Sequence, residues 1–241
     1  MSNSYFRFKQ FTVNQEKTAM KVCTDACLFG AYISSKEKLA TNNQTSILDI
    51  GAGTGLLSLM IAQKLSGNID AVEIDEDAYK QAQENFKSTA WKTRLSAFHA
   101  DVTKLTFSKK YDIIISNPPF FTDSLKSNNE QKNIAKHTAF LSYTALASVA
   151  YSNLAGNGRF YILLPYKEFE VFEKIATKSQ LAMIKRADIK PTPSSGYFRT
   201  IGVFTNAREQ PITAESLTIK DNNNKYTYEF IELLKDYYLY L

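Results

Sequence analysis

Apolar positions in this chain form short runs of aliphatic and β-branched residues, separated by longer segments with helical spacing. Five of these runs predict buried strands, at residues 46–50, 69–74, 94–99, 112–116 and 159–164. Residues 181–190 and 199–205 predict an antiparallel pair that closes the sheet. Strands that alternate with helices indicate an α/β fold. We therefore expect a Rossmann-like, mostly parallel sheet of seven strands with helices on both faces.

The segments between the strands predict helices. Thr24-Asp25 offers an N-cap to the first helix, and Ala78, Ala82 and Phe86 recur every four residues in the third. The polar residues 122–136 predict a mobile loop over the carboxyl edge of the sheet. The expected helices cover residues 26–34, 56–62, 76–88, 141–154, 166–178 and 226–239.

A length of 241 residues, 44% of them hydrophobic, suits one α/β domain with small additions. We divide it into an N-terminal extension on the substrate side, residues 1–45, and a Rossmann-like catalytic core, residues 46–241. The start of the chain lacks the apolar run of a signal peptide, and no stretch is long enough to cross a membrane. We therefore expect a cytoplasmic monomer without membrane association.

The two cysteines and two histidines predict no metal site. Cys23 and Cys27 have no second cysteine pair nearby, and His99 and His137 are distant in sequence. A reduced pair of thiols is the simpler interpretation. The net charge of +5 is compatible with a polyanionic partner such as RNA.

A glycine-rich turn follows the first buried strand. Gly51, Gly53 and Gly55 stand between this strand and an apolar helix, where glycines let a nucleotide approach the backbone closely. A dinucleotide fingerprint would need its third glycine at position 56, which is Leu56. This disfavours a dinucleotide oxidoreductase. G-x-G-x-G preceded by Asp49 resembles instead the pattern of S-adenosylmethionine-dependent methyltransferases.

Acidic residues at the ends of the next two strands are candidates for binding such a cofactor. Glu73 lies about 20 residues beyond the glycine turn, a position suited to ribose hydroxyls. Asp75 is the rival candidate, although it also suits the N-cap of the next helix. Asp101, followed by Val102, could accept a hydrogen bond from the adenine amino group or could simply cap a helix.

The fourth strand ends in Asn117-Pro118-Pro119-Phe120, which carries the candidate chemistry. Proline cannot donate to a sheet, so the strand must stop there. The Asn117 side-chain carbonyl and the Pro118 backbone carbonyl could both accept hydrogen bonds from one planar NH2 group. Phe120 could stack on the attached base. Read structurally, the same residues would be only a proline-terminated strand with an asparagine turn.

Basic and aromatic residues gather in two regions. Residues 1–23, the N-terminal arm, could form a packed strand or could cover the substrate site. Residues 185–208 have a basic excess that could face RNA or could be ordinary surface charge. Candidate substrate-binding residues are Arg7, Lys9, Lys21, Thr24, Asp25, Lys185, Arg186 and Arg199.

Two motifs carry a family resemblance. Asp49-Ile-Gly-Ala-Gly-Thr-Gly55 and Asn117-Pro-Pro-Phe120 resemble the amino-methylating class of Rossmann-like methyltransferases. Phe8-Lys9-Gln10-Phe11 and the segment from Ala19 to Asp25 make the chain similar to the bacterial tRNA1(Val) (adenine-37 N6)-methyltransferase family over nearly its whole length. Lys190-Pro191 and the residues from Tyr226 to Phe230 are also similar to that family.

Two residues depart from the family pattern. Cys23 stands where glycine is expected, and Phe120 replaces the more usual tyrosine. Neither change removes a group that the chemistry needs, because the ring at position 120 acts by stacking.

The resemblance implies S-adenosylmethionine-dependent N6-methylation of an adenine beside the anticodon of a tRNA, without a metal. It implies a class I methyltransferase fold and cofactor contacts from Asp49, Gly51, Gly53, Gly55, Glu73, Asp101, Val102 and Asn117. The same turn would serve methylation of guanine N2 in rRNA, of adenine in DNA, or of a protein glutamine amide. A cofactor-binding RNA-interaction protein without turnover is the alternative of another class.

Overall fold

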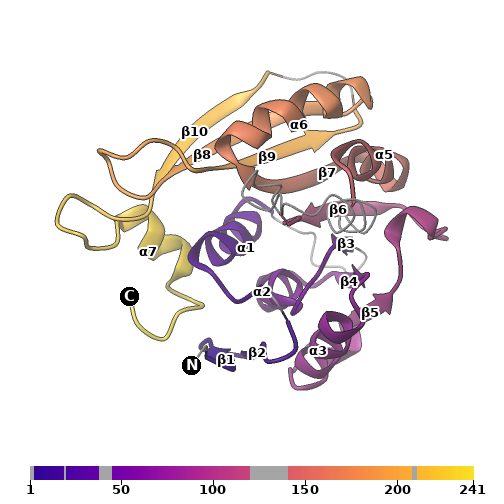
Figure 1. Cartoon of the computed structure of the whole chain (residues 1–241), viewed down its shortest axis with the longest axis horizontal. Helices are drawn as coiled ribbons and strands as arrows, with labels where there is room; N and C mark the ends of the chain where they lie inside the picture. Colours follow the sequence, from indigo (N-terminus) through magenta and orange to yellow (C-terminus); the bar gives the residue numbers. More distant parts are fainter. Residues whose placement is uncertain (1–2, 19, 38–44, 120–140, 208–210) are drawn as a thin grey trace, which may run out of the picture.

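The structure is a computed structural model that describes residues 3–18, 20–37, 45–119, 141–207 and 211–241. Its centre is a sheet of eight strands in the order β10-β8-β9-β7-β6-β3-β4-β5 (Figure 1). The strands are β3 Ser46–Ile50, β4 Asn68–Glu73, β5 Leu95–His99, β6 Tyr111–Ser116, β7 Leu154–Pro165, β8 Ala182–Lys190, β9 Arg199–Thr205 and β10 Thr213–Thr218.

Five strands, β5-β4-β3-β6-β7, pair in parallel, so their carboxyl ends meet at one edge of the sheet. Strand β9 runs antiparallel to both β7 and β8. The predicted α/β class, the five central strands and the antiparallel closing pair are thus confirmed.

The predicted count of seven strands was wrong, because β10 adds an eighth. It pairs in parallel with β8 and forms the edge of the sheet. Its sequence, Thr-Ala-Glu-Ser-Leu-Thr, is mostly polar, and none of its residues is buried. Contacts with helix α1, Thr24–Lys36, help to hold it: Tyr32 donates to Glu215 Oε1 at 2.5 Å, and Lys36 forms an ion pair with the same carboxylate. Such tertiary contacts leave no periodic pattern in the sequence.

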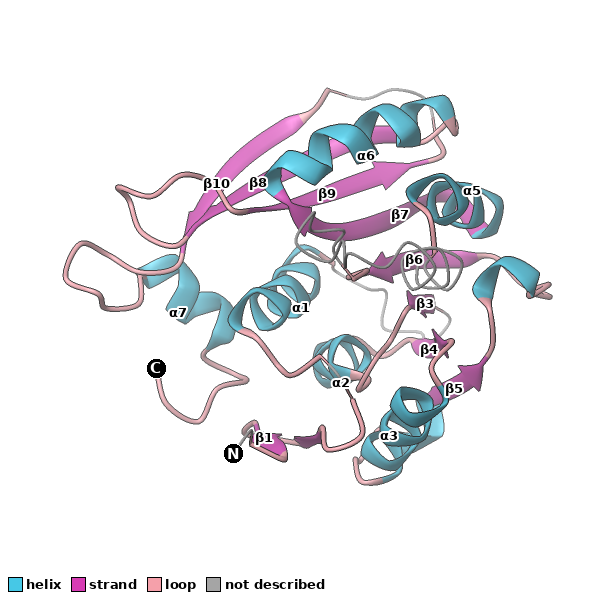
Figure 2. Ribbon diagram, in the orientation of Figure 1, coloured by secondary structure: helices cyan, strands magenta, loops and turns pink. Residues whose placement is uncertain are grey.

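Helices cover both faces of the sheet (Figure 2). Ile113 and Ile115 of β6 belong to the core cluster shared with α1, α2, α3 and α7, while Ile114 belongs to the cluster shared with α5 and α6. This two-sided burial explains the continuous apolar runs of the central strands. The helices are α1 Thr24–Lys36, α2 Leu56–Lys64, α3 Glu76–Lys87, α5 Tyr143–Asn153, α6 Tyr166–Lys178 and α7 Tyr228–Leu234, with 3-10 turns η1 Lys92–Arg94 and η2 Val102–Lys104. None of the described helices is long and apolar enough to span a membrane.

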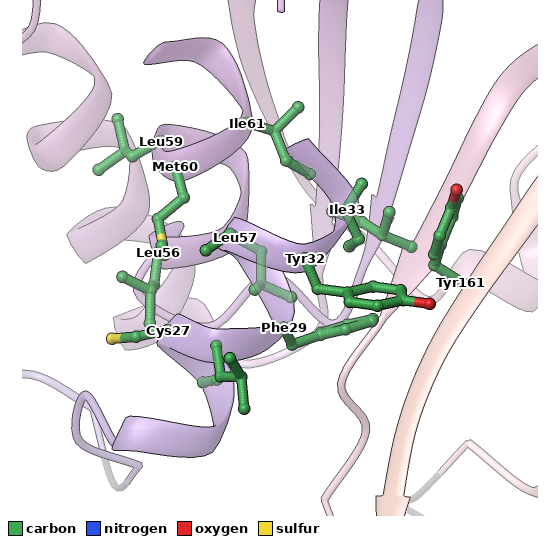
Figure 3. Packing of buried hydrophobic residues seen from close by; sticks show 14 of the residues in the cluster. Cys27, Phe29, Tyr32, Ile33, Leu56, Leu57, Leu59, Met60, Ile61 and Tyr161 are labelled. Carbon is green, nitrogen blue, oxygen red and sulfur yellow. The ribbon is translucent and has the colours of Figure 1, made fainter. Parts of the chain in front are cut away.

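Helices α1 and α2 pack closely against each other, and Tyr161 of β7 lies beside Tyr32 and Ile33 of α1 (Figure 3). A Cβ atom placed on Gly30 would lie 2.8 Å from the sulfur of Met60, so glycine permits this approach. The contact holds the beginning of α1 beside the glycine turn that precedes α2.

Several element boundaries differ from the sequence predictions, and three of these differences bear on the fold. The N-cap of α1 is Cys23, so Asp25 lies in the first turn of the helix, where its carboxylate accepts a hydrogen bond from Arg199 Nε at 2.8 Å. Strand β7 begins at Leu154, where a helix end and a turn were expected, and it accommodates Asn157 at a φ of 64°. Helix α7 spans only seven residues, from Tyr228 to Leu234.

The first residues of the chain form a small packed hairpin, β1 Tyr5–Arg7 and β2 Thr12–Asn14. Phe8 and Phe11 are buried and stack with ring centroids 4.5 Å apart. The hairpin is tied to α3 by Asn85, which is fully buried and exchanges two hydrogen bonds with the backbone of Asn14. The packed-strand interpretation therefore holds for residues 5–14.

Asp49 of β3 is a carboxylate in the core. It is 0% exposed, and its Oδ2 accepts a hydrogen bond from Ser58 Oγ of α2 at 2.7 Å. Its Oδ1 has no hydrogen-bond partner among the described residues. Burial, together with the nearby charge of Glu73, raises the pKa of Asp49 to about 7. The native state therefore holds a proton on Asp49 at pH values where the unfolded chain has released it.

This predicts a specific pH dependence of stability. The contribution of Asp49 to the free energy of unfolding should decrease as pH rises from about 4, the ordinary aspartate pKa, to about 7. Asp49→Asn should lose this dependence and gain stability relative to wild type across that window, with a limiting slope of about 1.4 kcal/mol per pH unit. Urea unfolding at several pH values measures it. Glu170→Gln, on the exposed face of α6, is the control, and equal pH slopes for wild type and Asp49→Asn would contradict the prediction.

Candidate active site

A cleft of about 760 Å³ lies at the carboxyl edge of the sheet, where β3, β4 and β6 end. Such edges are where ligands bind in open α/β sheets, and the volume is within the range of small-molecule sites. The predicted site residues that line it are Lys21, Gly51, Gly53, Glu73, Asp101, Val102, Asn117, Pro118 and Pro119.

The glycine turn forms the floor of the cleft. Gly51 and Gly53 have φ angles of 74° and 56°, and a Cβ atom at either would meet nothing within 4 Å. A ligand can therefore approach the backbone there. Gly55 does not line the cleft. Its φ is 80°, and a Cβ would lie 2.4 Å from the ring of Phe86, so this glycine allows α2 to begin against α3.

Glu73 ends β4 beside this turn and orders it. Its Oε2 accepts a hydrogen bond from the Gly53 backbone N–H at 2.8 Å, and its Oε1 accepts from the N–H groups of Ile74 and Asp75 at 2.9 Å. An ionised carboxylate offers about four acceptor positions, so one remains for a ligand hydroxyl. Asp75 caps α3 by accepting from Ala78 N–H at 2.8 Å, as predicted for it.

Asp101 and its neighbours form the opposite wall. Asp101 Oδ1 caps the 3-10 turn η2 by accepting from the Thr103 N–H and hydroxyl, and these hydrogen bonds lower the pKa of Asp101. Val102 is buried, whereas Ile74 is 54% exposed although it lines the cleft. The sequence analysis missed Ile74. An apolar residue between two strand-end acids, Glu73 and Asp75, could have indicated it.

Asn117 follows β6 directly and carries the most distinctive group in the cleft. The strand end is anchored by Ser116, whose hydroxyl donates to the Ile50 carbonyl of β3 at 2.9 Å. The Asn117 Oδ1 atom is buried and has no hydrogen-bond partner within the described part of the chain. A buried acceptor without a partner costs about 1–3 kcal/mol, and at the wall of a cleft a bound ligand with a donor group can remove that cost.

The residues after Asn117 are described only in part. Pro118 is buried and Pro119 is exposed, and both line the cleft. Phe120 and the predicted loop at residues 122–136 lie outside the described residues. The next described residues, Leu141 and Ser142, also line the cleft.

The later part of the N-terminal arm borders the cleft. Lys17, Thr18 and the residues from Met20 to Cys23 line it. Lys21 Nζ donates to the backbone carbonyls of Gln15 and Thr18, which shapes this part of the arm. Asn85, also missed from the sequence, ties the arm to the glycine turn by donating to the Thr54 carbonyl at 2.9 Å.

Cys23 occupies the position where the family pattern has glycine, and it borders the cleft. Its φ and ψ of −131° and 158° are extended, so a side chain is accommodated there without backbone strain. Although Cys23 as a residue is exposed, partial desolvation of its thiol and the nearby Asp25 charge raise the pKa of the thiol.

The remaining candidate substrate residues lie apart from the cleft lining. Arg7 and Thr24 are exposed, and Lys9 Nζ donates to the Lys235 carbonyl. Arg199 pairs with Asp25, and Arg186 is held by both oxygens of Asp188. Arg186 and Lys185 lie on β8, three strands away from β6.

The cleft therefore combines an open glycine turn, strand-end carboxylates, apolar walls and one unpaired amide oxygen. No group of three or more metal-ligating side chains occurs among the described residues. The arrangement can hold a nucleoside and orient a planar amino group beside it.

Comparison with known proteins agrees with this geometry. The methyltransferase small domain family matches residues 35–180. A tRNA1(Val) (adenine(37)-N6)-methyltransferase of Flavobacterium psychrophilum is 41% identical over 97% of this chain and 99% of its own length. The enzyme of the same name from Phocaeicola vulgatus is 40% identical over 99% of both chains.

Solved structures share the fold at low sequence identity. A predicted O-methyltransferase from Agrobacterium tumefaciens superimposes with a TM-score of 0.67 at 16% identity, covering 88% of this chain and 96% of the other. A TehB-like methyltransferase from Corynebacterium glutamicum gives a TM-score of 0.52 at 17% identity, covering 78% and 89%. The fold is thus that of the class I methyltransferases, and the chain belongs to the family of tRNA1(Val) (adenine(37)-N6)-methyltransferases.

Proposed function

We propose that this enzyme methylates N6 of an adenine in tRNA, and that the target is adenine-37 beside the anticodon of tRNA1(Val). The observation that carries the proposal is the unpaired, buried Oδ1 of Asn117 at the carboxyl end of β6. An exocyclic NH2 group supplies the donor that this acceptor lacks. The names of relatives that match nearly the whole chain support tRNA as the substrate.

The cofactor is proposed to be S-adenosylmethionine, which supplies an electrophilic methyl group when bound. The cleft fits it, because Gly51 and Gly53 leave open space against the backbone and Glu73 retains an acceptor position for a ribose hydroxyl. Ile74 and Val102 offer apolar surface to a purine, and Asp101 a carboxylate. Asp49 is proposed to support the glycine turn indirectly, because it joins β3 to α2 through its hydrogen bond with Ser58. We propose no role for a metal.

Substrate orientation is assigned to the turn after β6. Asn117 Oδ1 and the Pro118 carbonyl accept the two hydrogens of the target NH2 group, which directs the nitrogen lone pair towards the methyl donor. Phe120 is proposed to stack on the target base after this base has flipped out of the stacked RNA loop. The two prolines restrict the backbone, so little entropy is lost when the acceptors engage. The amino group can release its extra proton to solvent after the transfer.

Other substrates with an amino group could bind the same pair of acceptors, but the rest of the chain favours RNA. Guanine N2 in rRNA, adenine in DNA and a protein glutamine amide are the competing substrates. The net charge of +5 favours a nucleic acid over a protein. A non-catalytic RNA-interaction protein would have no need for the unpaired acceptor at Asn117.

We propose the division of the chain and the substrate-binding residues that the sequence predicted. Residues 1–45 act as the substrate-side extension and residues 46–241 as the catalytic core, in a cytoplasmic monomer. Arg7, Lys9, Lys21 and Thr24 are proposed to approach the tRNA from the extension. Arg199 and Asp25 are proposed to act as a pair, and Lys185 and Arg186 as a more distant basic region.

Loss of one modified nucleoside tests the substrate directly. In tRNA from a strain lacking this protein, mass spectrometry should show N6-methyladenosine missing from tRNA1(Val) at position 37, and expression of the intact chain should restore it. Unchanged N6-methyladenosine in that tRNA, with N-methylglutamine lost from a protein, would favour the glutamine alternative.

Glu73→Gln tests the cofactor assignment. The change removes a charge-assisted acceptor worth about 1.5–3 kcal/mol, so calorimetry should show S-adenosylhomocysteine bound roughly ten- to one-hundred-fold more weakly. Asp75→Asn is the matched control, because asparagine caps a helix as well as aspartate does, and its affinity should stay close to wild type. The reverse result would assign the ribose to Asp75.

Asn117→Ala tests the orientation of the target. Removing the acceptor should lower the single-turnover rate on tRNA by several orders of magnitude, given effective molarities of about 10⁵–10⁸ M for well-oriented groups. Cofactor affinity should remain close to wild type, and thermal stability should not fall, because the change removes a buried acceptor without a partner. Phe120→Tyr should stay active, whereas Phe120→Ala should lose roughly 1–3 kcal/mol of base stacking and mainly weaken tRNA binding.

Asn206 supplies the matched control for Asn117. It also has a buried Oδ1 without a partner among the described residues, but it follows β9 at the opposite edge of the sheet. Asn206→Ala should leave the methyl-transfer rate unchanged. Full activity in Asn117→Ala, with cofactor binding intact, would mean that the turn is only structural.

A further inference from the structure

The carboxyl edge of the sheet continues beyond the cleft. Strand β7 runs parallel to β6, so Pro165 and Tyr166 lie at the same edge as Asn117. Because β9 is antiparallel to β7 and to β8, its first residue, Arg199, and the last residue of β8, Lys190, also lie there. Figure 2 shows the carboxyl end of β6 and the connection between β8 and β9 on the same side of the sheet.

Two tyrosines and a lysine form an aromatic and basic surface at this edge. The rings of Tyr166 and Tyr197 stack with centroids 5.3 Å apart and planes 23° apart. Tyr197 is 37% exposed, and Lys190 Nζ lies 4.6 Å from the centre of its ring. No carboxylate of the described residues forms an ion pair with Lys190. This surface therefore presents an exposed ring and an ammonium group without a counter-charge.

The backbone holds this surface in place. Tyr166 N–H donates to the Phe198 carbonyl at 3.2 Å, and Phe198 N–H donates to the Ile189 carbonyl at 3.0 Å. On the side of α6, the Arg186 guanidinium lies 5.2 Å from the centre of the Tyr166 ring. A binding partner would meet preorganised rings rather than a segment that must first be ordered.

An ion pair joins this surface to the cleft. Arg199, the residue after Phe198, pairs with Asp25 at 2.8 Å. Asp25 lies in the first turn of α1, two residues after Cys23, which lines the cleft. The surface and the catalytic turn therefore face the same side of the molecule and are connected through one wall of the cleft.

We propose that Tyr166, Tyr197 and Lys190 bind an unpaired nucleotide of the RNA next to the target adenine. The inference rests on the proposed function. An aromatic ring offers a stacking face to any base, and a lysine without a counter-charge suits the adjoining phosphate. Lys190 is partly exposed, and the contact between such a lysine and a ring is weak, so Lys190 can exchange it for the phosphate when the base stacks on Tyr197. An RNA loop presents an unpaired base and its adjoining phosphate together.

Tyr197→Ala tests the stacking. With S-adenosylhomocysteine present, the affinity for the unmethylated anticodon stem-loop of tRNA1(Val), measured by fluorescence anisotropy, should fall roughly five- to one-hundred-fold. Its salt dependence should not change, and Tyr197→Phe, which keeps the ring, should bind as wild type. Tyr151→Ala is the matched control: Tyr151 is also 37% exposed, but it lies at the carboxyl end of α5, next to the start of β7 at the opposite edge.

Lys190→Gln tests the charge separately. Loss of one phosphate contact should reduce the slope of log affinity against log salt concentration by about 0.7, the value for a single strand. Lys178→Gln, at the exposed carboxyl end of α6, should leave the slope unchanged. Cofactor affinity should be the same in all variants, since none of these residues lines the cleft.

The outcomes separate the two proposals. If wild type methylates and binds the stem-loop while Tyr197→Ala and Lys190→Gln behave as wild type, the surface does not contact RNA and the proposed function stands. If wild type neither binds nor methylates the stem-loop or the intact tRNA, the proposed function fails and the inference with it.

Discussion

The acceptor at Asn117 exists because a strand buried on both faces is stopped by two prolines. Strand β6 packs Ile114 on one side and Ile113 and Ile115 on the other, so its position in the sheet is strongly determined. Pro118 and Pro119 cannot continue the pairing, and the chain must turn at the sheet edge. The turn leaves the Asn117 Oδ1 buried and without a partner among the described residues. The free energy gained by burying the strand thus offsets the cost of the unpaired polar group at its end.

The neighbouring strands bring the other parts of the site to the same edge. Strand β3 lies between β6 and β4, so the glycine turn sits between Asn117 and Glu73. Glu73 fastens the turn through Gly53, and Asp49 fastens β3 to α2 through Ser58. Burial, and to a smaller extent the charge of Glu73, disfavour the ionised form of Asp49 and raise its pKa.

Local sequence pattern predicted the central sheet and the elements around the cleft. Continuous β-branched runs marked the buried strands, and the distance from the glycine turn marked Glu73. The pattern could not predict features that depend on tertiary contacts. Strand β10 is polar and is held by contacts with α1. Asp25 does not cap α1 but lies in its first turn and pairs with Arg199. Gly55 belonged to the same motif as Gly51 and Gly53, yet its role is decided by the ring of Phe86 in another helix.

A crystal structure of the protein with S-adenosylhomocysteine and the unmethylated anticodon stem-loop of tRNA1(Val) would test the central claim most directly. The distance from the target N6 nitrogen to Asn117 Oδ1 decides it. The account predicts a hydrogen bond of about 2.7–3.2 Å to that atom and a second to the Pro118 carbonyl. A target adenine whose amino group is held by other residues, with Asn117 Oδ1 remaining unpaired or bonded within the protein, would contradict it.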